Sequence, residues 1–273
     1  ATESYLVKLD VTKDAKTFDS DTTIVFSCTK PGSEIFVDAI TDSVSLIELN
    51  GVALDPASHS DGIRITVPGL AAQNTLRIVA KGIYSNTGEG LHRFVDPVDG
   101  EVYLYTQFEV PDSRRMFPVF EQPDLKATFE FHITAPSNWQ VISNSTTPEP
   151  IAVDDKNSEW RFAPTPRISS YITALIAGPY SVWRDELTSL DGRIIPLGVF
   201  CRGSLAQYMD PEYIFEKTKE GFVFFEKAFN FPYPFEKYDQ VIVPEFNAGA
   251  IENAGCVTYY EGVIYRSRAT DHE

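Results

Sequence analysis

The sequence predicts a mainly β protein, in which an N-terminal antiparallel β-sandwich or saddle is followed by the start of an α+β domain. Short segments rich in β-branched and aromatic residues recur from residue 5 to about residue 182, with turn signals between them. No convincing amphipathic helix interrupts this series. Aromatic residues make up 13% of the 273-residue chain, and most are Phe or Tyr, which favour strands. We therefore expect a β domain over residues 1–186 and part of a second domain over residues 187–273.

The predicted strands of the first domain follow one another at the regular spacing typical of a sandwich. Asn50-Gly51 is a strong hairpin signal, because both residues readily adopt positive φ. The segment 145–157 contains Pro148 and Pro150 and is expected to be an exposed loop. The expected strands are Tyr5–Val11, Thr22–Thr29, Glu34–Asp38, Val44–Leu49, Ile63–Val67, Leu76–Tyr84, Val102–Phe108, Ala127–Thr134, Trp139–Ser143, Glu159–Phe162 and Tyr171–Ile176.

The pattern changes near residue 180, and a long helix is expected in the second domain. Asp210 fits an N-cap and Pro211 the first helical position, and the helix should run to about Phe229, where Pro232 and Pro234 stop it. One face of this helix carries apolar and small residues at 3.6-residue spacing, and we expect that face to pack in the core. Its members are Ile214, Thr218, Gly221, Phe222, Phe225 and Phe229.

Strands are expected on both sides of this helix. Arg193–Phe200 precedes it, after an Asp191-Gly192 turn, and Tyr238–Val243 and Val257–Tyr260 follow it. Gly262–Tyr265 is predicted to continue the last strand. The second domain then has about 85 residues, fewer than the roughly 100–150 typical of a domain, so we expect it to be cut off.

The composition limits the kinds of partner and compartment. A net charge of −16 argues against binding to nucleic acid or to an anionic membrane, and no apolar run is long enough to cross a bilayer. The three cysteines are widely spaced, which argues against a disulfide framework and favours a reducing, cytoplasmic location. No two of the four histidines have metal-ligand spacing, so no zinc site within this chain is expected. The sequon at Asn144 is interpreted as a chance match in a turn.

The segment 244–255 is the first candidate functional stretch. It follows an apolar strand and consists mainly of small residues, which let a ligand approach the backbone closely. Glu252 adds a carboxylate beside Gly249 and Ala250. A carboxylate next to exposed strand-like backbone suits the amino end of a peptide, since it can bind the ammonium group while the backbone pairs with the first peptide unit. The alternative is a small-residue loop with a solvated Glu.

The second candidate stretch is the end of the Val102–Phe108 strand. Gln107 and Glu109 are two residues apart, so they should share one face and could hold a cationic group. The loop from Arg114 to Lys126 mixes charges with aromatic residues. We favour a structural role for that loop over a functional one.

Together these two stretches resemble the zinc aminopeptidases of the alanyl-aminopeptidase (gluzincin) family. The resemblance lies in Thr-Gln-x-Glu from residue 106, in the Arg-Arg-x-Phe-Pro to Lys-Ala-Thr-Phe segment over 114–129, and in Gly-Ala-Ile-Glu-Asn over 249–253. The family usually has Gly-Ala-Met-Glu-Asn, so Ile251 replaces a Met. Gly90–Phe94 is also similar to the family, and the details look most like its bacterial, actinobacterial-type members.

The resemblance implies a fold and a set of roles. It implies a saddle-like β domain, then a thermolysin-like catalytic domain, and an enzyme that releases N-terminal amino acids from peptides with a free N-terminus. Glu252 would bind the α-amino group, while Gly249, Ala250 and Asn253 would form a wall along the peptide backbone. Gln107 and Glu109 would line the S1 side, and Glu109 would help to anchor the amino group.

The zinc motif of the family, His-Glu-x-x-His, is not complete in this sequence. His272-Glu273 matches its first two residues, but it lies closer to Glu252 than the roughly thirty residues usual in the family. We interpret it as a surface dipeptide. The resemblance therefore implies zinc in the full-length enzyme, no bound zinc in residues 1–273, and no peptidase activity of this part alone. Two alternatives remain: a family-like scaffold that binds proteins without catalysis, and a carbohydrate-binding β-sandwich.

Overall fold

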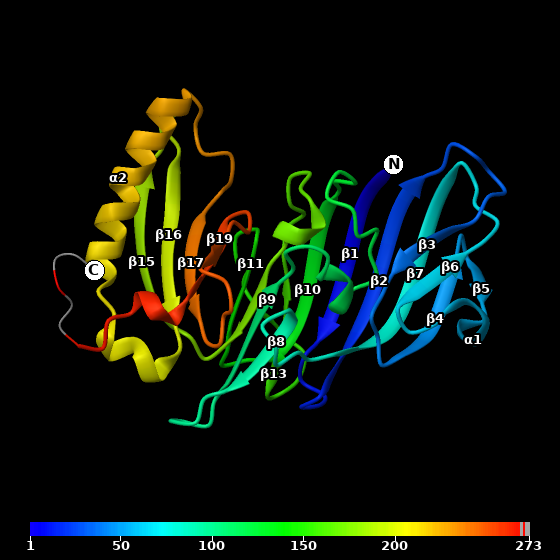
Figure 1. The fold of residues 1–273 in the computed structure, drawn as a ribbon, viewed down its shortest axis with the longest axis horizontal. Helices are drawn as coiled ribbons and strands as arrows, with labels where there is room; N and C mark the ends of the chain where they lie inside the picture. The colour runs from blue at the N-terminus through cyan, green and yellow to red at the C-terminus, as the bar shows by residue number, and fades with distance from the viewer. Residues whose placement is uncertain (268–269, 271–273) are drawn as a thin grey trace.

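The computed structural model describes residues 1–267 and residue 270, and most of the chain forms β-sheets (Figure 1). The predicted fold class is confirmed. Three sheets follow one another along the long axis, from the N-terminal strands at one end to the helix α2 at the other. No helix in the described residues is both long and apolar enough to cross a membrane.

The largest sheet has eight strands in the order β12-β13-β10-β1-β2-β7-β4-β5. Its pairs are antiparallel except for β1 with β10, which run parallel with Ser4 opposite Thr128. The regular inward–outward alternation of β2 and β10 buries one side chain in two, as expected for strands with one covered face. The strands are β1 Thr2–Asp10, β2 Thr17–Ser27, β4 Ser43–Leu49, β5 Val52–Leu54, β7 Gln73–Ile83, β10 Thr128–Pro136, β12 Ile151–Ala152 and β13 Asn157–Arg161.

A four-stranded sheet forms the middle layer, in the order β11-β14-β9-β8. Its strands are β8 Gly90–Val95, β9 Val102–Gln107, β11 Gln140–Ser143 and β14 Leu175–Gly178. The strand β9 is buried along almost its whole length because both of its faces are covered. Leu104 packs with the core of the large sheet, whereas Tyr103 and Tyr105 pack with residues of the third sheet. A small pair, β3 Ile35–Asp38 with β6 Arg64–Val67, and the short helix α1 Pro56–His59 lie at the end of the molecule farthest from α2, beside β4 and β5 of the large sheet (Figure 1).

The third sheet has five strands in the order β15-β16-β17-β19-β18 and mixes parallel with antiparallel pairs. Its strands are β15 Ser181–Thr188, β16 Ile194–Cys201, β17 Tyr238–Val243, β18 Ala250–Ile251 and β19 Cys256–Tyr260. The helix α2 Pro211–Phe229 packs on it through Phe215, which joins Ile195, Leu197 and Val199 in one core. The predicted N-cap is confirmed, since Asp210 accepts from the Tyr213 N–H. The helix ends at Phe229 as expected, and Asn230, in the left-handed conformation with φ of 50°, caps it.

Several expected strands differ in the structure. Tyr171–Ile176 is not one strand, because a 3-10 turn, η2 Ser170–Ile172, precedes β14. Gly262–Tyr265 does not continue β19, since the 3-10 turn η4 Glu261–Val263 takes its place. The strands β8 and β15 were not predicted. β15 contains residue 186, the expected end of the first domain, and pairs fully with β16. The domain division at residues 186 and 187 stays a prediction.

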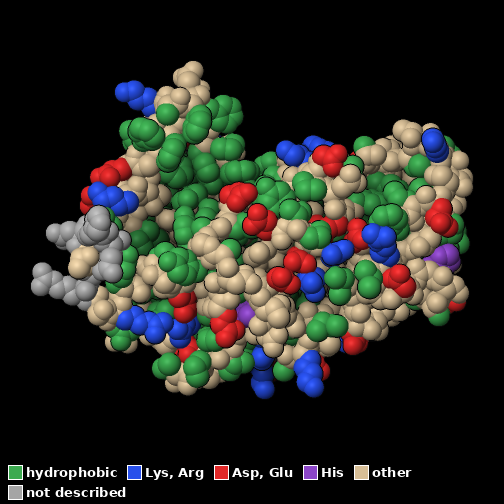
Figure 2. Space-filling view, viewed as in Figure 1, with side chains coloured by type: hydrophobic (Ala, Val, Ile, Leu, Met, Phe, Trp, Pro, Cys, Tyr) green, Lys and Arg blue, Asp and Glu red, His purple; other side chains and the backbone are tan. Residues whose placement is uncertain are grey.

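The apolar face of α2 is also more exposed than expected. Phe225 and Phe229 are 56% and 75% exposed. They border a groove of about 780 Å³ between the helix and the segment 231–234, whose lining also includes Ile214, Gly221 and Phe222. Figure 2 shows hydrophobic side chains gathered over this part of the molecule. The expectation that the whole stripe lies in the core is therefore wrong for the described residues.

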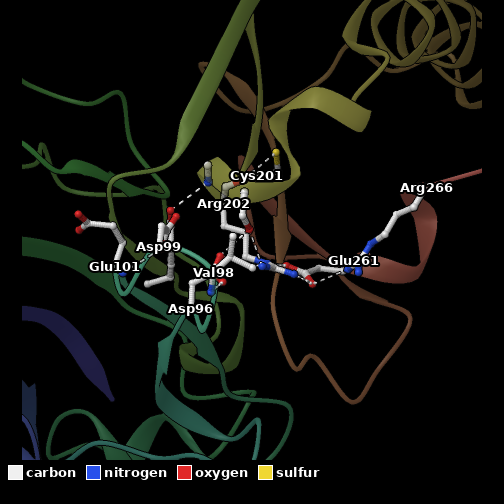
Figure 3. Close-up of polar contacts among 11 residues, drawn as sticks. Asp96, Val98, Asp99, Glu101, Cys201, Arg202, Glu261 and Arg266 are labelled. Atoms are coloured by element: carbon white, nitrogen blue, oxygen red, sulfur yellow. Dashed lines mark hydrogen bonds and ion pairs between the residues drawn. The ribbon is translucent and has the colours of Figure 1, made fainter.

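A buried ion-pair network joins the second and third sheets (Figure 3). Arg202, at the end of β16, donates to Asp96 at 2.7 Å and makes a bidentate pair with Glu261 at 2.6 and 3.0 Å. Ser204 also donates to Asp96, at 2.5 Å. Only 9% of the Arg202 side chain and none of the Asp96 side chain are exposed. The network thus fixes the third sheet to the loop after β8. The segment that follows β17 belongs to this same sheet.

Candidate functional site

The candidate site is built on β18, the edge strand of the third sheet. The loop 244–249 leads from β17 into this two-residue strand, which pairs with β19 so that Ala250 lies opposite Tyr259. Gly249 accepts a hydrogen bond from the Tyr260 N–H, and both Gly249 and Ala250 are exposed. A Cβ placed on Gly249 would meet no atom within 4 Å, so the backbone here is open to a ligand. Among the described strands only β19 pairs with β18, which leaves its outer edge available for another extended chain.

Glu252 directly follows this edge strand and its side chain is exposed. Its Oε1 accepts a hydrogen bond of 3.2 Å from the Tyr171 hydroxyl, which belongs to η2. Partial burial, the hydrogen bond to Glu252, and the charges of Glu252 and Glu109 all raise the pKa of Tyr171 above its usual value. The hydrogen bond thus joins η2 of the N-terminal region to the predicted carboxylate, although 81 residues separate the two in sequence.

Gln107 and Glu109 have different environments. Gln107 is the last residue of β9 and is only 8% exposed, while Glu109 lies in the following turn and is exposed. The Gln107 side-chain oxygen accepts the Glu109 N–H at 2.5 Å. They therefore do not extend side by side from one strand face, because the strand ends between them. Gln107 instead holds the turn that presents Glu109.

Asn253 lies inside the β18–β19 hairpin. It is 2% exposed, its carbonyl accepts the Cys256 N–H at 3.0 Å, and its amide donates to Thr258 at 3.4 Å. These contacts give Asn253 a role in closing the turn beside Glu252. Its contact with a substrate stays a prediction.

The loop before β18 is held by the N-terminal region, through residues that sequence reasoning did not select as functional. Buried His92 accepts the Gly88 N–H at Nδ1, so its neutral ring carries the proton at Nε2 and donates to Glu245 at 3.1 Å. Burial lowers the pKa of His92, although the hydrogen bond and charge of Glu245 oppose the shift. Asn247 also donates to the Thr87 carbonyl at 2.9 Å. The only sequence signal for His92 was its place in the family-like segment Gly90–Phe94.

The loop from Arg114 to Lys126 has the structural role that the sequence favoured. Phe117 and Phe120 are buried in the core. Glu121 accepts hydrogen bonds from the Ser113 hydroxyl, the Arg114 N–H and the Ser170 hydroxyl, and burial raises its pKa although these bonds oppose the shift. These contacts fix the loop against η2, the turn that carries Tyr171.

Two sequence-based expectations concern modification and metal binding. Asn144 is 7% exposed, and its amide donates to the carbonyls of Ile172 and Ala254, so the side chain of the sequon asparagine is bonded within the protein.

Within residues 1–267 and 270, no group of three His, Cys, Asp or Glu side chains could hold a metal ion. The described residues therefore do not fit a catalytic zinc ion. His272-Glu273 lies outside the described residues.

The fold defines a mainly β protein in which β18 is the exposed edge strand of the third sheet. Comparison with known proteins gives its family. Residues 1–172 match the Peptidase M1 N-terminal domain, and residues 213–272 match the Peptidase family M1 domain. The chain therefore belongs to peptidase family M1.

The similar proteins are much longer than this chain. Aminopeptidase N of Streptomyces lividans is 53% identical over 98% of the chain, which corresponds to 31% of that protein. Aminopeptidase Ey of Gallus gallus is 35% identical over 62% of the chain, and Aminopeptidase 2 of Candida albicans is 27% identical over 93% of it. The chain spans 17% and 28% of these two relatives. It thus covers less than a third of each.

Proposed function

We propose that this chain supplies the binding site for the substrate amino end in a zinc-dependent aminopeptidase that releases N-terminal amino acids from peptides. The observation that carries the proposal is the position of Glu252, an exposed carboxylate directly after the exposed edge strand β18. A peptide with a free N-terminus needs both an anion for its ammonium group and backbone groups for its first peptide unit. Membership in family M1 and the names of the similar proteins support the same activity.

Each predicted site residue has a place in this proposal. Glu252 binds the α-ammonium group, and Glu109 adds a second negative charge near it. Gly249 and Ala250 pair with the peptide backbone through the free edge of β18. Gln107 lines the S1 side and holds Glu109 in its turn. Asn253 shapes the hairpin from within.

The proposal assigns zinc to residues outside the described part. The described residues hold no group of three His, Cys, Asp or Glu side chains that could bind it. When bound in the whole protein, zinc would supply the activated water for peptide hydrolysis. Residues 1–273 alone should then show no zinc-dependent turnover of an aminoacyl-arylamide. Turnover by this part at rates like those of the whole protein would contradict the proposal.

The role of Glu252 can be tested in the whole protein with Glu252→Ala. Loss of a charge-assisted hydrogen bond to the substrate should lower kcat/KM for an aminoacyl-arylamide by about tenfold to a hundredfold. The zinc content should not change, because Glu252 holds the substrate and not the metal. Glu216→Ala, an exposed carboxylate on α2, is the matched control and should leave both quantities as they are. Loss of zinc in Glu252→Ala would contradict the assigned role.

We also propose a cytoplasmic location and, as partners, peptides with a free N-terminus rather than nucleic acid. Cys28, Cys201 and Cys256 are free thiols, which is typical of a reducing compartment. The net charge of −16 disfavours nucleic acid as a partner. Oxidation state of the three thiols in freshly isolated protein tests the location, since a disulfide among them would contradict it.

A further inference from the structure

We propose that Tyr171, in the N-terminal domain, is a positioning residue that orients Glu252 for the substrate ammonium group. The inference rests on the proposed function of Glu252. Its first basis is direct contact, because the Tyr171 hydroxyl donates to Glu252 Oε1 at 3.2 Å. A carboxylate has two oxygens with about four acceptor sites, so Oε2 stays free to accept from a ligand while Oε1 is held.

The backbone around both residues is clamped as well. The Ala254 N–H, two residues after Glu252, donates to the carbonyl of Ile172, the neighbour of Tyr171, at 3.2 Å. Buried Asn144 donates from one amide nitrogen to the carbonyls of Ile172 and Ala254, at 2.8 and 2.9 Å. Tyr171 and Glu252 are therefore fixed relative to each other at main chain and side chain, although 81 residues separate them.

Gly255 shows how closely the hairpin that carries Glu252 approaches Asn144, the residue that bonds to η2. Its φ is +70°, and a Cβ there would lie 2.7 Å from the Asn144 carbonyl oxygen. Lys237, which is 4% exposed, also donates to the Gly255 carbonyl at 2.8 Å. The hairpin that carries Glu252 thus has little freedom to move away from η2.

Orientation by Tyr171 has a clear physical benefit. An exposed glutamate samples many rotamers and must give up that freedom when it binds a ligand, so a side chain that is already held binds better. A tyrosine hydroxyl ordinarily keeps its proton up to about pH 10, and the pKa of Tyr171 is raised further, so Tyr171 is a donor at neutral pH. A neutral donor to Glu252 holds this carboxylate before the cationic substrate arrives.

The test is a double-mutant cycle in the whole protein with Tyr171→Phe and Glu252→Ala. Tyr171→Phe removes one oxygen and keeps the ring. It should lower kcat/KM for an aminoacyl-arylamide about fivefold, mainly by raising KM, as expected for one lost hydrogen bond. Zinc content and thermal midpoint should stay unchanged. In the Glu252→Ala background the same change should have less than about a twofold effect, because no carboxylate is left to orient. Tyr208→Phe, which alters a surface tyrosine at the end of the 3-10 turn η3 Gly203–Tyr208, is the matched control.

The outcomes separate this inference from the proposed function. If Tyr171→Phe keeps the kcat/KM of the wild type, or lowers it equally in both backgrounds, Tyr171 does not act through Glu252 and the inference is wrong. If Glu252→Ala itself leaves kcat/KM unchanged, the proposed function of Glu252 fails first. A fivefold loss of kcat/KM in Tyr171→Phe that disappears in the Glu252→Ala background supports both the function of Glu252 and the positioning role of Tyr171.

Discussion

The core of the N-terminal domain and the outer face of α2 use the same residue type but bury it to different degrees. Phe129 and Phe131 are at most 1% exposed, and they lie in an aromatic cluster with Tyr5 and Phe117. Phe225 and Phe229 stack on each other along α2, yet more than half of each side chain is exposed. Periodicity predicts which side chains share a face. What covers that face depends on other segments: other strands cover Phe129 and Phe131, whereas within the described residues Phe225 and Phe229 stay more than half exposed.

The largest expected effect comes from truncating one phenylalanine in each region of the 273-residue chain. Phe129→Ala should lower the free energy of unfolding by about 3–5 kcal/mol, because it leaves a cavity in a closed core. Phe229→Ala should cost less than about 1 kcal/mol, since its ring already contacts solvent. Urea unfolding followed by tryptophan fluorescence measures both. Equal losses of stability would show that Phe229 is as well buried as Phe129 and contradict the difference between the two faces.

A second substitution tests the junction between these regions. Arg202→Met leaves Asp96 buried without its cationic partner and should lower the free energy of unfolding by about 3 kcal/mol. Arg77→Met breaks an exposed pair with Asp21 and should cost less than about 1 kcal/mol. Chemical denaturation of both variants gives the comparison. A loss as small for Arg202 as for Arg77 would show that the buried network does not stabilise the junction.

A smaller effect is expected at the start of α2. Asp210→Ala removes the side chain that accepts the Tyr213 N–H and should cost about 1 kcal/mol. Hydrogen exchange should become faster in the first turn of α2 and stay unchanged in the strands of the large sheet. Faster exchange throughout the N-terminal domain would indicate that the helix and that domain unfold as one unit.

The smallest effect concerns pH. Although burial opposes it, hydrogen bonds from Ser204, Val98 and Arg202 lower the pKa of Asp96. A lowered folded pKa stabilises the protein above the unfolded value near 4, and this contribution is lost as the pH falls through the folded pKa. Unfolding measured between pH 6 and pH 3 should therefore show a weaker acid dependence in Asp96→Asn than in the unchanged chain. Identical curves would assign the acid sensitivity to other carboxylates.

Local signals were enough to predict the fold class and the helix α2 with both of its ends. Alternation, turn residues and caps act within a few residues, so the sequence displays them directly. The strand β8 was missed because its buried residues are consecutive and show no alternation, and β15 because it buries only Leu187 and carries three charged residues in a row. Glu252 and Glu109 were selected from their surroundings in sequence. Tyr171 and His92 were not, because each acquires its contact with Glu252 or Glu245 only when segments 81 and 153 residues apart fold together.

The central claim is that Glu252 recognises the free amino end of a peptide. The most direct measurement is the Kd of a non-hydrolysable peptide analogue, by calorimetry on the whole protein, with its N-terminus either free or acetylated. We predict that the free form binds roughly tenfold or more tightly, as expected for one charge-assisted hydrogen bond, and that Glu252→Gln removes this preference. A preference for the free amino end that survives Glu252→Gln unchanged would contradict the claim.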